Sequence, residues 1–423
     1  MAEPMIYLDN AATTWPKPEA VYGAVDAAMR ERGANPGRGS YRMSVDAQRI
    51  VDEARQEICR LFNAPDPARV IFTMSCTDAL CMALNGLIEA GDYVVTGPFE
   101  HNSVVRPLYS LRRTGTEVAT AKSTAAFGID LDHFRFLCRD GVDYVILSHV
   151  SNVMGSLSPV KEIAEITHER GGLLILDAAQ SAGCLEIDMQ HLGVDILAAP
   201  GHKGLYGPMG IGALVLSAPI SVKPFRVGGT GFKSESPGHP SEYPWRLEAG
   251  TINLPGIAGL AAGVRFVNSV GINAIAEHEA TLARTLVDGL RNIDGVTVFG
   301  EPVPRTGVVS FRLDSADVAL TGTILDGAFG IAVRTGLHCA PKTHKAIGTL
   351  PEGTVRASFG HFNTQDDVDA LIAAIRQIKK TNAAASLQKG PRGSSMAKLP
   401  SARISVTRAT GLTVGCDRSS RPA

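Results

Sequence analysis

The glycine-rich segment AAPGHKGLYGPMGIG (198–212) contains one lysine, Lys203. It lies between two apolar runs, DILAA (195–199) and ALVLS (213–217), which have the composition of buried strands. Lysine is rarely buried unless it is paired or used, because moving an ammonium group out of water costs several kcal/mol. The segment therefore predicts a central sheet with a paired or functional lysine at the end of one strand.

Outward from this segment, strand-like runs alternate with segments of helical period, which is typical of an α/β fold with a mostly parallel sheet. Besides the two runs above, the predicted strands are VIFTM (70–74), YVVTG (93–97), EVATA (117–121), DYVILSHV (143–150) and LLILD (173–177). The predicted helices cover 45–62, 77–89, 103–113, 130–139 and 159–170. We therefore predict a large domain with a seven-stranded, mostly parallel sheet between helices.

The second half of the chain follows a different pattern after a long Gly/Pro/Ser-rich passage at 227–251. Its predicted elements are a long helix at 255–293, strands at 296–300 and 307–313, and helices at 319–329 and 365–379. This order predicts a smaller α+β domain. The predicted boundaries are 16–262 for the large domain, 263–380 for the small domain with an N-terminal arm at 1–15, and 381–423 for a disordered basic tail.

Composition restricts the class of protein. The 423 residues are 44% hydrophobic and 20% charged, as in ordinary globular chains, and the formal net charge is −1. Without a basic field, a small molecule is a better expected partner than nucleic acid or a membrane surface. The N-terminus does not show the pattern of a secretory signal, so we expect a cytoplasmic protein.

The cysteines indicate neither a disulfide framework nor a metal site, because they are odd in number and scattered, with no CxxC pair and no zinc-like Cys/His spacing. They are Cys59, Cys76, Cys81, Cys138, Cys184, Cys339 and Cys416. Most of them suit core packing, because free cysteine behaves as a small apolar residue. No metal is expected.

Polar residues follow several predicted strands, and ligands of open parallel sheets bind at the carboxyl ends of strands. Thr77 opens a helix after the strand at 70–74, where free N–H groups favour a phosphate, although a plain helix cap is an equal alternative. His101 follows the next strand, and a lone histidine is more often structural. Asp177 ends the strand at 173–177, where it could also cap a turn.

Taken together, a phosphate cradle, a histidine, a strand-end carboxylate and a buried lysine predict pyridoxal phosphate as cofactor. Its aldehyde needs a lysine, and its ring nitrogen needs a carboxylate such as Asp177. Desolvation would also help Lys203 to lose its proton near neutral pH. A nucleotide-binding glycine loop is the alternative, but that loop should directly follow a first strand and open a helix, whereas here a strand follows.

At these residues the chain resembles the cysteine desulfurase and selenocysteine lyase group of the class V aminotransferase family, which has the pyridoxal phosphate fold type I. The resemblance covers about residues 5–380. Its motifs are YLDNAATT, NPGRGS, FEHNS, HVSNVMG, ILDAAQSAG, GHKGLYGPMGIG, EAGTIN, RTGLHC and TVRASFGHFNT. So many matches in the same order make the resemblance specific.

The resemblance implies a role for each matching residue. Lys203 matches the lysine that binds the cofactor as a Schiff base, Asp177 the partner of the pyridine nitrogen, and His101 the residue stacked on the ring that also assists catalysis. Asn152 and Gln180 match side chains near the ring hydroxyl or the substrate.

The same resemblance implies the phosphate and carboxylate sites. Thr77 and His202 match phosphate ligands, with backbone help from Cys76. Thr251 matches a phosphate contact that reaches in from the other subunit, which implies a homodimer. Arg356 matches the arginine that binds the substrate carboxylate in a bidentate pair.

Cys339, in RTGLHC, is similar to the sulfur-accepting cysteine of the desulfurases. The expected activity is conversion of L-cysteine to L-alanine, with a persulfide formed on Cys339 and passed to an acceptor protein. A nearby positive charge would favour the thiolate, and His338 and Arg334 are the candidates. Relatives commonly have a histidine at Leu337, so the means of thiol activation stays open, and a serine at Pro200, whose hydroxyl would be a phosphate ligand that this chain lacks.

Three alternatives remain at this point. A selenocysteine lyase acting on L-selenocysteine shares the same framework, and a true class V aminotransferase would not need Cys339. A non-enzymatic sulfur-delivery scaffold would depend on its partner surface more than on turnover.

Overall fold

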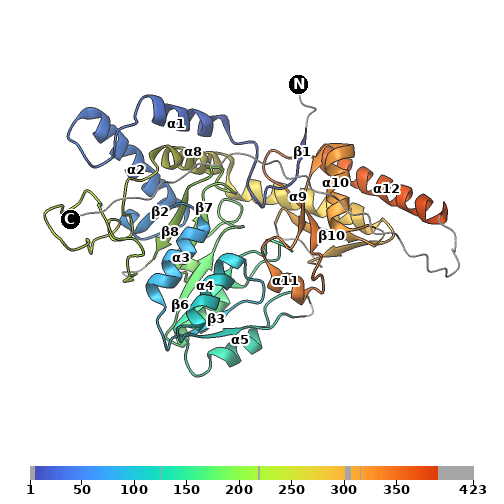
Figure 1. Cartoon of the computed structure of the whole chain (residues 1–423), viewed down its shortest axis with the longest axis horizontal. Coiled ribbons are helices and arrows are strands. Elements are labelled where there is room, and N and C mark those ends of the chain that lie inside the picture. The colour runs from blue at the N-terminus through green and yellow to red at the C-terminus, as the bar shows by residue number, and fades with distance from the viewer. Residues whose placement is uncertain (1–4, 125, 218–219, 301–305, 315, 389–423) are drawn as a thin grey trace, which may run out of the picture.

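The computed structural model describes residues 5–124, 126–217, 220–300, 306–314 and 316–388 (Figure 1). Its centre is a seven-stranded sheet in the order β2-β8-β7-β6-β5-β3-β4. The strands are β2 Val70–Thr73, β3 Tyr93–Thr96, β4 Glu117–Thr120, β5 Tyr144–Ser148, β6 Leu173–Asp177, β7 Ile196–Pro200 and β8 Gly212–Leu216. All neighbouring pairs are parallel except those that β8 makes with β2 and β7. The predicted mostly parallel sheet is confirmed.

Helices cover both faces of this sheet. They are α1 Glu19–Arg30, α2 Arg42–Leu61, η1 Pro67–Arg69, α3 Cys76–Leu87, α4 Asn102–Arg112, α5 Leu131–Cys138, α6 Val160–Glu169 and α7 Met189–Leu192. Successive residues of one strand point to opposite faces, so Val94 packs into the core with α3 and α4, and Val95 into the core with α2, α5 and α6. Burial on both faces explains why these strands are apolar throughout.

The C-terminal part contains a second, antiparallel sheet in the order β12-β13-β10-β9, seen with α10 and α12 at the right of Figure 1. Its elements are β9 Val296–Phe299, β10 Val308–Leu313, α10 Val318–Phe329, β11 Ile331–Ala332, β12 Arg334–Gly336, α11 Pro341–Ala346, β13 Thr354–Ser358 and α12 Gln365–Gln388. The N-terminal strand β1 Ile6–Tyr7 pairs with β11 in parallel. The N-terminal arm therefore joins the part of the fold that the C-terminal residues build.

The predicted long helix at 255–293 is two helices, α8 Leu254–Val270 and α9 Ile272–Arg291. They meet at an angle of 80°, with Gly271 at φ +90° between them, a backbone conformation that few other residues adopt. Among the described residues, no single helix is long and apolar enough to cross a membrane. This bent pair reaches the length and apolar composition, but α8 is largely buried in the core.

Two sequence predictions concern boundaries. The boundary at 262–263 falls inside α8 and, like the other domain limits, stays a prediction. The first residues of the segment predicted to be a disordered tail, from 381, are helical, because α12 continues to Gln388 through the alanine-rich run NAAAS (382–386), whose alanines favour a helix. The remainder, 389–423, lies outside the described residues, together with Cys416. The described cysteines are all free.

Candidate active site

A cavity of about 90 Å³ opens where strands of the large sheet end. Eight residues singled out in the sequence line it together: Cys76, Thr77, His101, Asn152, Asp177, Gln180, His202 and Lys203. They come from the last residue of β6 and from the segments that follow β2, β3, β5, β6 and β7. The parallel strands bring these loops to one edge of the sheet, which explains how residues far apart in the chain form one site.

Lys203 follows β7 and is half-buried beside the cavity. Its side chain makes no hydrogen bond to any residue that the structure describes. Burial lowers the pKa of its amine, the nearby side chains of Cys76 and Asp177 oppose that change, and Arg356 adds to it. Lys203 is therefore placed to act as a neutral amine more readily than an exposed lysine.

Asp177 is the last residue of β6 and is buried. Its Oδ1 accepts hydrogen bonds from the Ala179 amide at 2.9 Å and the Cys76 thiol at 3.5 Å. The apolar strand before it explains the burial, and the two donors hold the carboxylate in one orientation.

The N-terminus of α3 faces the cavity. Ser75 caps the helix by accepting from the Asp78 amide, so Cys76 and Thr77 form the start of the first turn. First-turn N–H groups of an α-helix lack partners within the helix, and the positive end of the helix dipole adds to their attraction for an anion. This end of the cavity is suited to a phosphate group.

Ser103 is a site residue that sequence reasoning missed. Its Oγ lies 2.7 Å from Thr77 Oγ1 and 2.8 Å from His101 Nδ1, and it joins the starts of α3 and α4. The Ser103 amide also donates to His101 Nδ1, so His101 caps α4. A polar residue two positions after a strand-end histidine was the available signal, because this spacing is typical of a cap.

The same hydrogen bond decides the state of His101. Burial lowers the pKa of the imidazole to about 4, so the ring is neutral at pH 7. Because Nδ1 accepts the Ser103 amide hydrogen, the ring proton is on Nε2. His101 is therefore a hydrogen-bond donor through Nε2.

Two buried polar atoms at this cavity have no partner in the described protein, Asn152 Oδ1 and His202 Nδ1. Buried polar atoms are normally paired, so a polar ligand at the cavity would satisfy them. Burial lowers the pKa of His202 to about 4, which leaves its ring neutral. An amine, a carboxylate, a helix N-terminus and these two atoms together fit pyridoxal phosphate.

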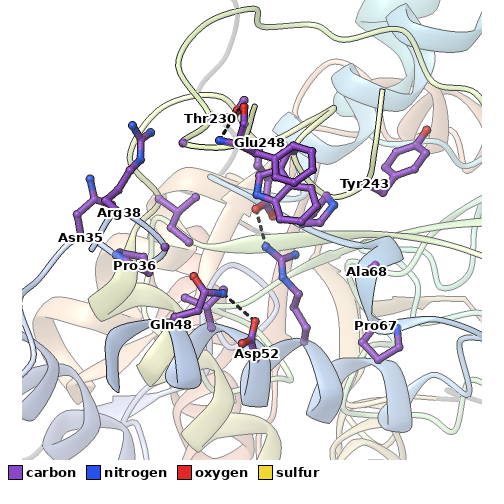
Figure 2. Close-up of a pocket in the computed structure, with 18 of the residues that line it drawn as sticks. Asn35, Pro36, Arg38, Gln48, Asp52, Pro67, Ala68, Thr230, Tyr243 and Glu248 are labelled. Atoms are coloured by element: carbon purple, nitrogen blue, oxygen red, sulfur yellow. Dashed lines mark hydrogen bonds and ion pairs between the residues drawn. The ribbon is translucent and has the colours of Figure 1, made fainter. Parts of the chain in front are cut away.

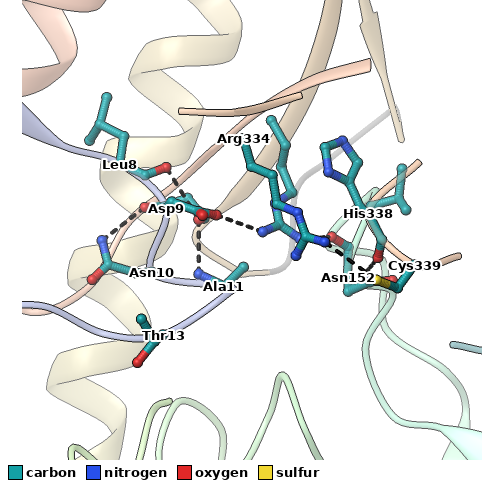
Figure 3. Close-up of polar contacts among 12 residues, drawn as sticks. Leu8, Asp9, Asn10, Ala11, Thr13, Asn152, Arg334, His338 and Cys339 are labelled. Atoms are coloured by element: carbon teal, nitrogen blue, oxygen red, sulfur yellow. Dashed lines mark hydrogen bonds and ion pairs between the residues drawn. The ribbon is translucent and has the colours of Figure 1, made fainter. Parts of the chain in front are cut away.

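Cys339 lies close to Asn152, one of the residues lining this cavity, on a segment of the C-terminal part (Figure 3). The Asn102 amide donates to its carbonyl at 2.9 Å, and Asn152 Nδ2 donates to the carbonyl of His338 at 2.6 Å. His338 and Cys339 both have left-handed φ angles, +48° and +59°, a conformation that is uncommon outside glycine. These contacts hold an exposed thiol next to the site that contains Lys203.

The cation near the thiol is Arg334, whose Nη2 lies 3.4 Å from Cys339 Sγ (Figure 3). His338 is buried, and burial lowers its pKa to about 2, so this ring carries no charge at neutral pH. The prediction that His338 supplies positive charge to the thiol is therefore wrong, and Arg334 is the remaining source.

Arg356 does not line the 90 Å³ cavity but is connected to it. It lies on β13 with a fully buried side chain, and its Nη1 donates to the Asn152 carbonyl at 2.9 Å. Its Nη2 donates to Asp9 Oδ1 at 2.7 Å, a contact that sequence reasoning missed. The motif YLDNAATT contained Asp9, but nothing in it indicated which cation Asp9 meets.

Thr251 is exposed and lies outside the cavity. Its neighbours border a second, larger cavity of about 760 Å³ (Figure 2). The segment that carries Thr251 is anchored by Glu248, which accepts from Arg55 at 2.5 Å and from the Phe72 amide at 2.6 Å. The role of Thr251 across a dimer stays a prediction.

Removal of Arg55 is expected to destabilise the protein strongly. The Arg55 and Glu248 side chains are only 7% and 6% exposed, so Arg55→Ala leaves a buried carboxylate without its partner. We expect a loss of about 3–5 kcal/mol in the free energy of unfolding, measured with urea at fixed protein concentration. The control is Arg30→Ala, which breaks the exposed pair with Asp26 and should cost less than about 1 kcal/mol. Equal losses in both variants would contradict the prediction.

Comparisons with known proteins agree with this geometry. The profile of the Aminotransferase class-V family matches residues 6–371. A probable cysteine desulfurase of Methanothermobacter thermautotrophicus is 35% identical, covering 88% of this chain and 94% of its own. A cysteine desulfurase of Klebsiella pneumoniae is 33% identical, covering 89% and 94%.

Solved structures give the same result. The apo structure of a cysteine desulfurase from Thermococcus onnurineus is similar to this chain with a TM-score of 0.84 and 32% identity, covering 89% of this chain and 95% of that one. The cysteine desulfurase CsdA of Escherichia coli, in an S-sulfonic acid form, has a TM-score of 0.81 and 28% identity over the same shares.

Proposed function

This chain belongs to the class V aminotransferase family, in its cysteine desulfurase group, and from that membership we propose that it converts L-cysteine to L-alanine with transfer of the sulfur to Cys339. The observation that carries the proposal is the position of an exposed thiol, fixed by two backbone contacts, beside a cavity with a buried amine and a carboxylate.

Pyridoxal phosphate is the cofactor that the family implies, and the residues present fit it. Lys203 would attach it covalently, Asp177 would pair with its ring nitrogen, and the start of α3 with His202 would hold its phosphate. When bound, the cofactor supplies an electron sink for negative charge at the substrate α-carbon.

Lys203 is the proposed base for the substrate α-proton, which its Nζ would accept. The lowered pKa of the amine favours this role, because a base must be unprotonated at the working pH. His101 is a neutral donor through Nε2 and would orient the reacting groups by a hydrogen bond.

Cys339 is the proposed sulfur acceptor. Its thiolate would attack the sulfur of L-cysteine, forming an S–S bond while the substrate C–S bond breaks. The electron pair of that bond goes to the substrate carbon, which takes a proton and becomes the methyl group of L-alanine. The resulting persulfide would pass its outer sulfur to a thiol or an acceptor protein. Arg334 supports the thiolate by its contact with Sγ.

Arg356 is the proposed partner of the substrate carboxylate, because it is a buried cation next to Asn152 with its Nε unpartnered. The homodimer with Thr251 at its interface, the acceptor protein and the cytoplasmic location remain predictions from the sequence.

The test is an assay of the full chain loaded with pyridoxal phosphate. With L-cysteine and a thiol reductant, we expect alanine and sulfide in equal amounts. Transfer of the amino group to a 2-oxo acid with the cysteine sulfur retained would indicate an aminotransferase instead. Release of selenide from L-selenocysteine without sulfide from L-cysteine would indicate a selenocysteine lyase. Full cofactor loading with no product from either substrate would favour a sulfur-delivery scaffold.

Arg334→Gln is expected to slow alkylation of Cys339 by iodoacetamide at neutral pH about three- to tenfold, because the cation at 3.4 Å from Sγ is lost and the thiolate is less favoured. Mass spectrometry of the Cys339 peptide over time measures the rate. Arg334→Lys is the matched control and should retain most of the reactivity. A rate in the glutamine variant equal to that of the parent chain would rule out this support.

A further inference from the structure

The guanidinium of Arg356 already holds a carboxylate of its own chain. Nη2 donates to Asp9 Oδ1 at 2.7 Å, Nη1 donates to the Asn152 carbonyl at 2.9 Å, and Nε is buried without a partner. The Arg356 side chain is fully buried and that of Asp9 is 22% exposed. A second carboxylate at Arg356 would therefore share the cation with Asp9.

Asp9 is held in place by backbone pairing. It forms a parallel bridge with Ser358 near the end of β13, two residues beyond Arg356, and the Ser358 amide donates to the Leu8 carbonyl at 2.7 Å. The Asp9 carbonyl accepts from the Ala12 amide at 3.0 Å. The backbone pairing therefore fixes the position of the Asp9 backbone beside Arg356, and the ion pair holds its carboxylate on the guanidinium.

The charges around Arg356 give Asp9 a specific effect. Arg334 faces Arg356 in the register of β12 and β13, so the two side chains lie on the same face of the sheet. Cys339 Sγ contacts Arg334, and Asp9 contacts Arg356. Burial lowers the pKa of Arg356, and Asp9 opposes this by stabilising the charged form. Asp9 thus keeps the cation charged but places a negative charge on the guanidinium to which the proposed function assigns the α-carboxylate.

We propose that Asp9 competes with the α-carboxylate of the ligand for Arg356 and so weakens binding of the substrate and of the product alanine alike. This inference rests on the proposed function, which assigns Arg356 to the carboxylate. Binding energy that is the same for the bound substrate and the transition state changes KM but not kcat. Weaker binding of the carboxylate in substrate and product therefore leaves the chemical step unchanged and favours release of alanine. Asp9 is in this sense a specificity residue of the carboxylate subsite.

The experiment compares L-alanine with L-alaninol, which has a hydroxymethyl group in place of the carboxylate, by calorimetric titration of the pyridoxal phosphate-loaded chain. Asp9→Asn removes the charge and keeps the size. We expect L-alanine to bind on the order of tenfold more tightly to this variant, with L-alaninol changed less than about twofold. Asp26→Asn is the control, because Asp26 lies in an exposed pair on α1.

A second variant, Asp9→Ser, should change the alanine-to-alaninol ratio in the same direction if the asparagine chain does not fold. The unmodified chain gives a further check, since it should prefer L-alanine over L-alaninol by less than about a hundredfold. Unchanged or weaker binding of L-alanine in both variants would overturn the inference. A preference of the unmodified chain for L-alanine over L-alaninol greater than about a hundredfold would overturn it as well. Failure of the proposed function is distinct, because the unmodified chain would then release no alanine from L-cysteine.

Discussion

Lys203→Ala is expected to lower alanine formation from L-cysteine by about 10²–10⁴-fold, the range for loss of a positioned acid–base group. The variant also loses the only amine lining the 90 Å³ cavity among the residues that the structure describes. Borohydride reduction of the loaded chain followed by peptide mapping should find the cofactor on the Lys203 peptide of the parent and on no peptide of the variant.

Lys17 provides the matched control for this result. It is a second lysine with a pKa lowered by burial, to about 8, and its Nζ donates to the His202 carbonyl at 2.7 Å. We expect Lys17→Met to retain cofactor attachment at Lys203 and to lose no more than about tenfold in activity, because it loses only hydrogen bonds to the His202 carbonyl and the Thr14 hydroxyl. Attachment at Lys17 in the parent chain would contradict the assignment of Lys203.

Cys339→Ser is expected to lower sulfide release from L-cysteine at least about 10²-fold while cofactor loading is unchanged, because a serine hydroxyl at neutral pH is a far weaker nucleophile than a thiolate. The side chain is exposed, so the substitution should not disturb folding. Sulfide and alanine are measured together, and loss of both with retained binding of L-cysteine is the specific outcome.

Cys81→Ser is the control for Cys339. Cys81 is half-buried on α3 and does not line the cavity, so its replacement should leave sulfide release within about twofold of the parent. Normal sulfide release by Cys339→Ser would show that sulfur leaves without an enzyme thiol. Loss of release from L-cysteine with full release of selenide from L-selenocysteine would reassign the chain as a selenocysteine lyase.

Much of the large sheet was predictable because its signal is local. Apolar runs bounded by glycine and polar residues predicted all seven strands to within about two residues, and the strand ends located Lys203, Asp177 and His101. The short strands β1, β11 and β12 and the break at Gly271 were missed, since two- or three-residue strands have no detectable period and a single glycine in a long apolar pattern is ambiguous.

The charge states of the site depended on burial that no motif reveals. His338 was expected as a cation from its place beside Cys339, but its burial makes it neutral and leaves Arg334 in contact with the sulfur. Likewise, the contact of the Ser103 hydroxyl with Thr77 depended on the packing of α3 against α4, although its role as part of the cap of α4 had a local signal.

The amino-acid sequence by itself determined the alternation of strands and helices, the lysine at a strand end and the membership of a chemical family, because each depends on motifs of residues close together in the chain. Only the tertiary structure decided that Asp9 pairs with Arg356, 347 positions away, and that Asn152 and Asn102 hold the segment of Cys339. Hydrogen bonds and ion pairs act over about 3 Å, so their partners are chosen by how the chain packs and not by how the sequence is ordered.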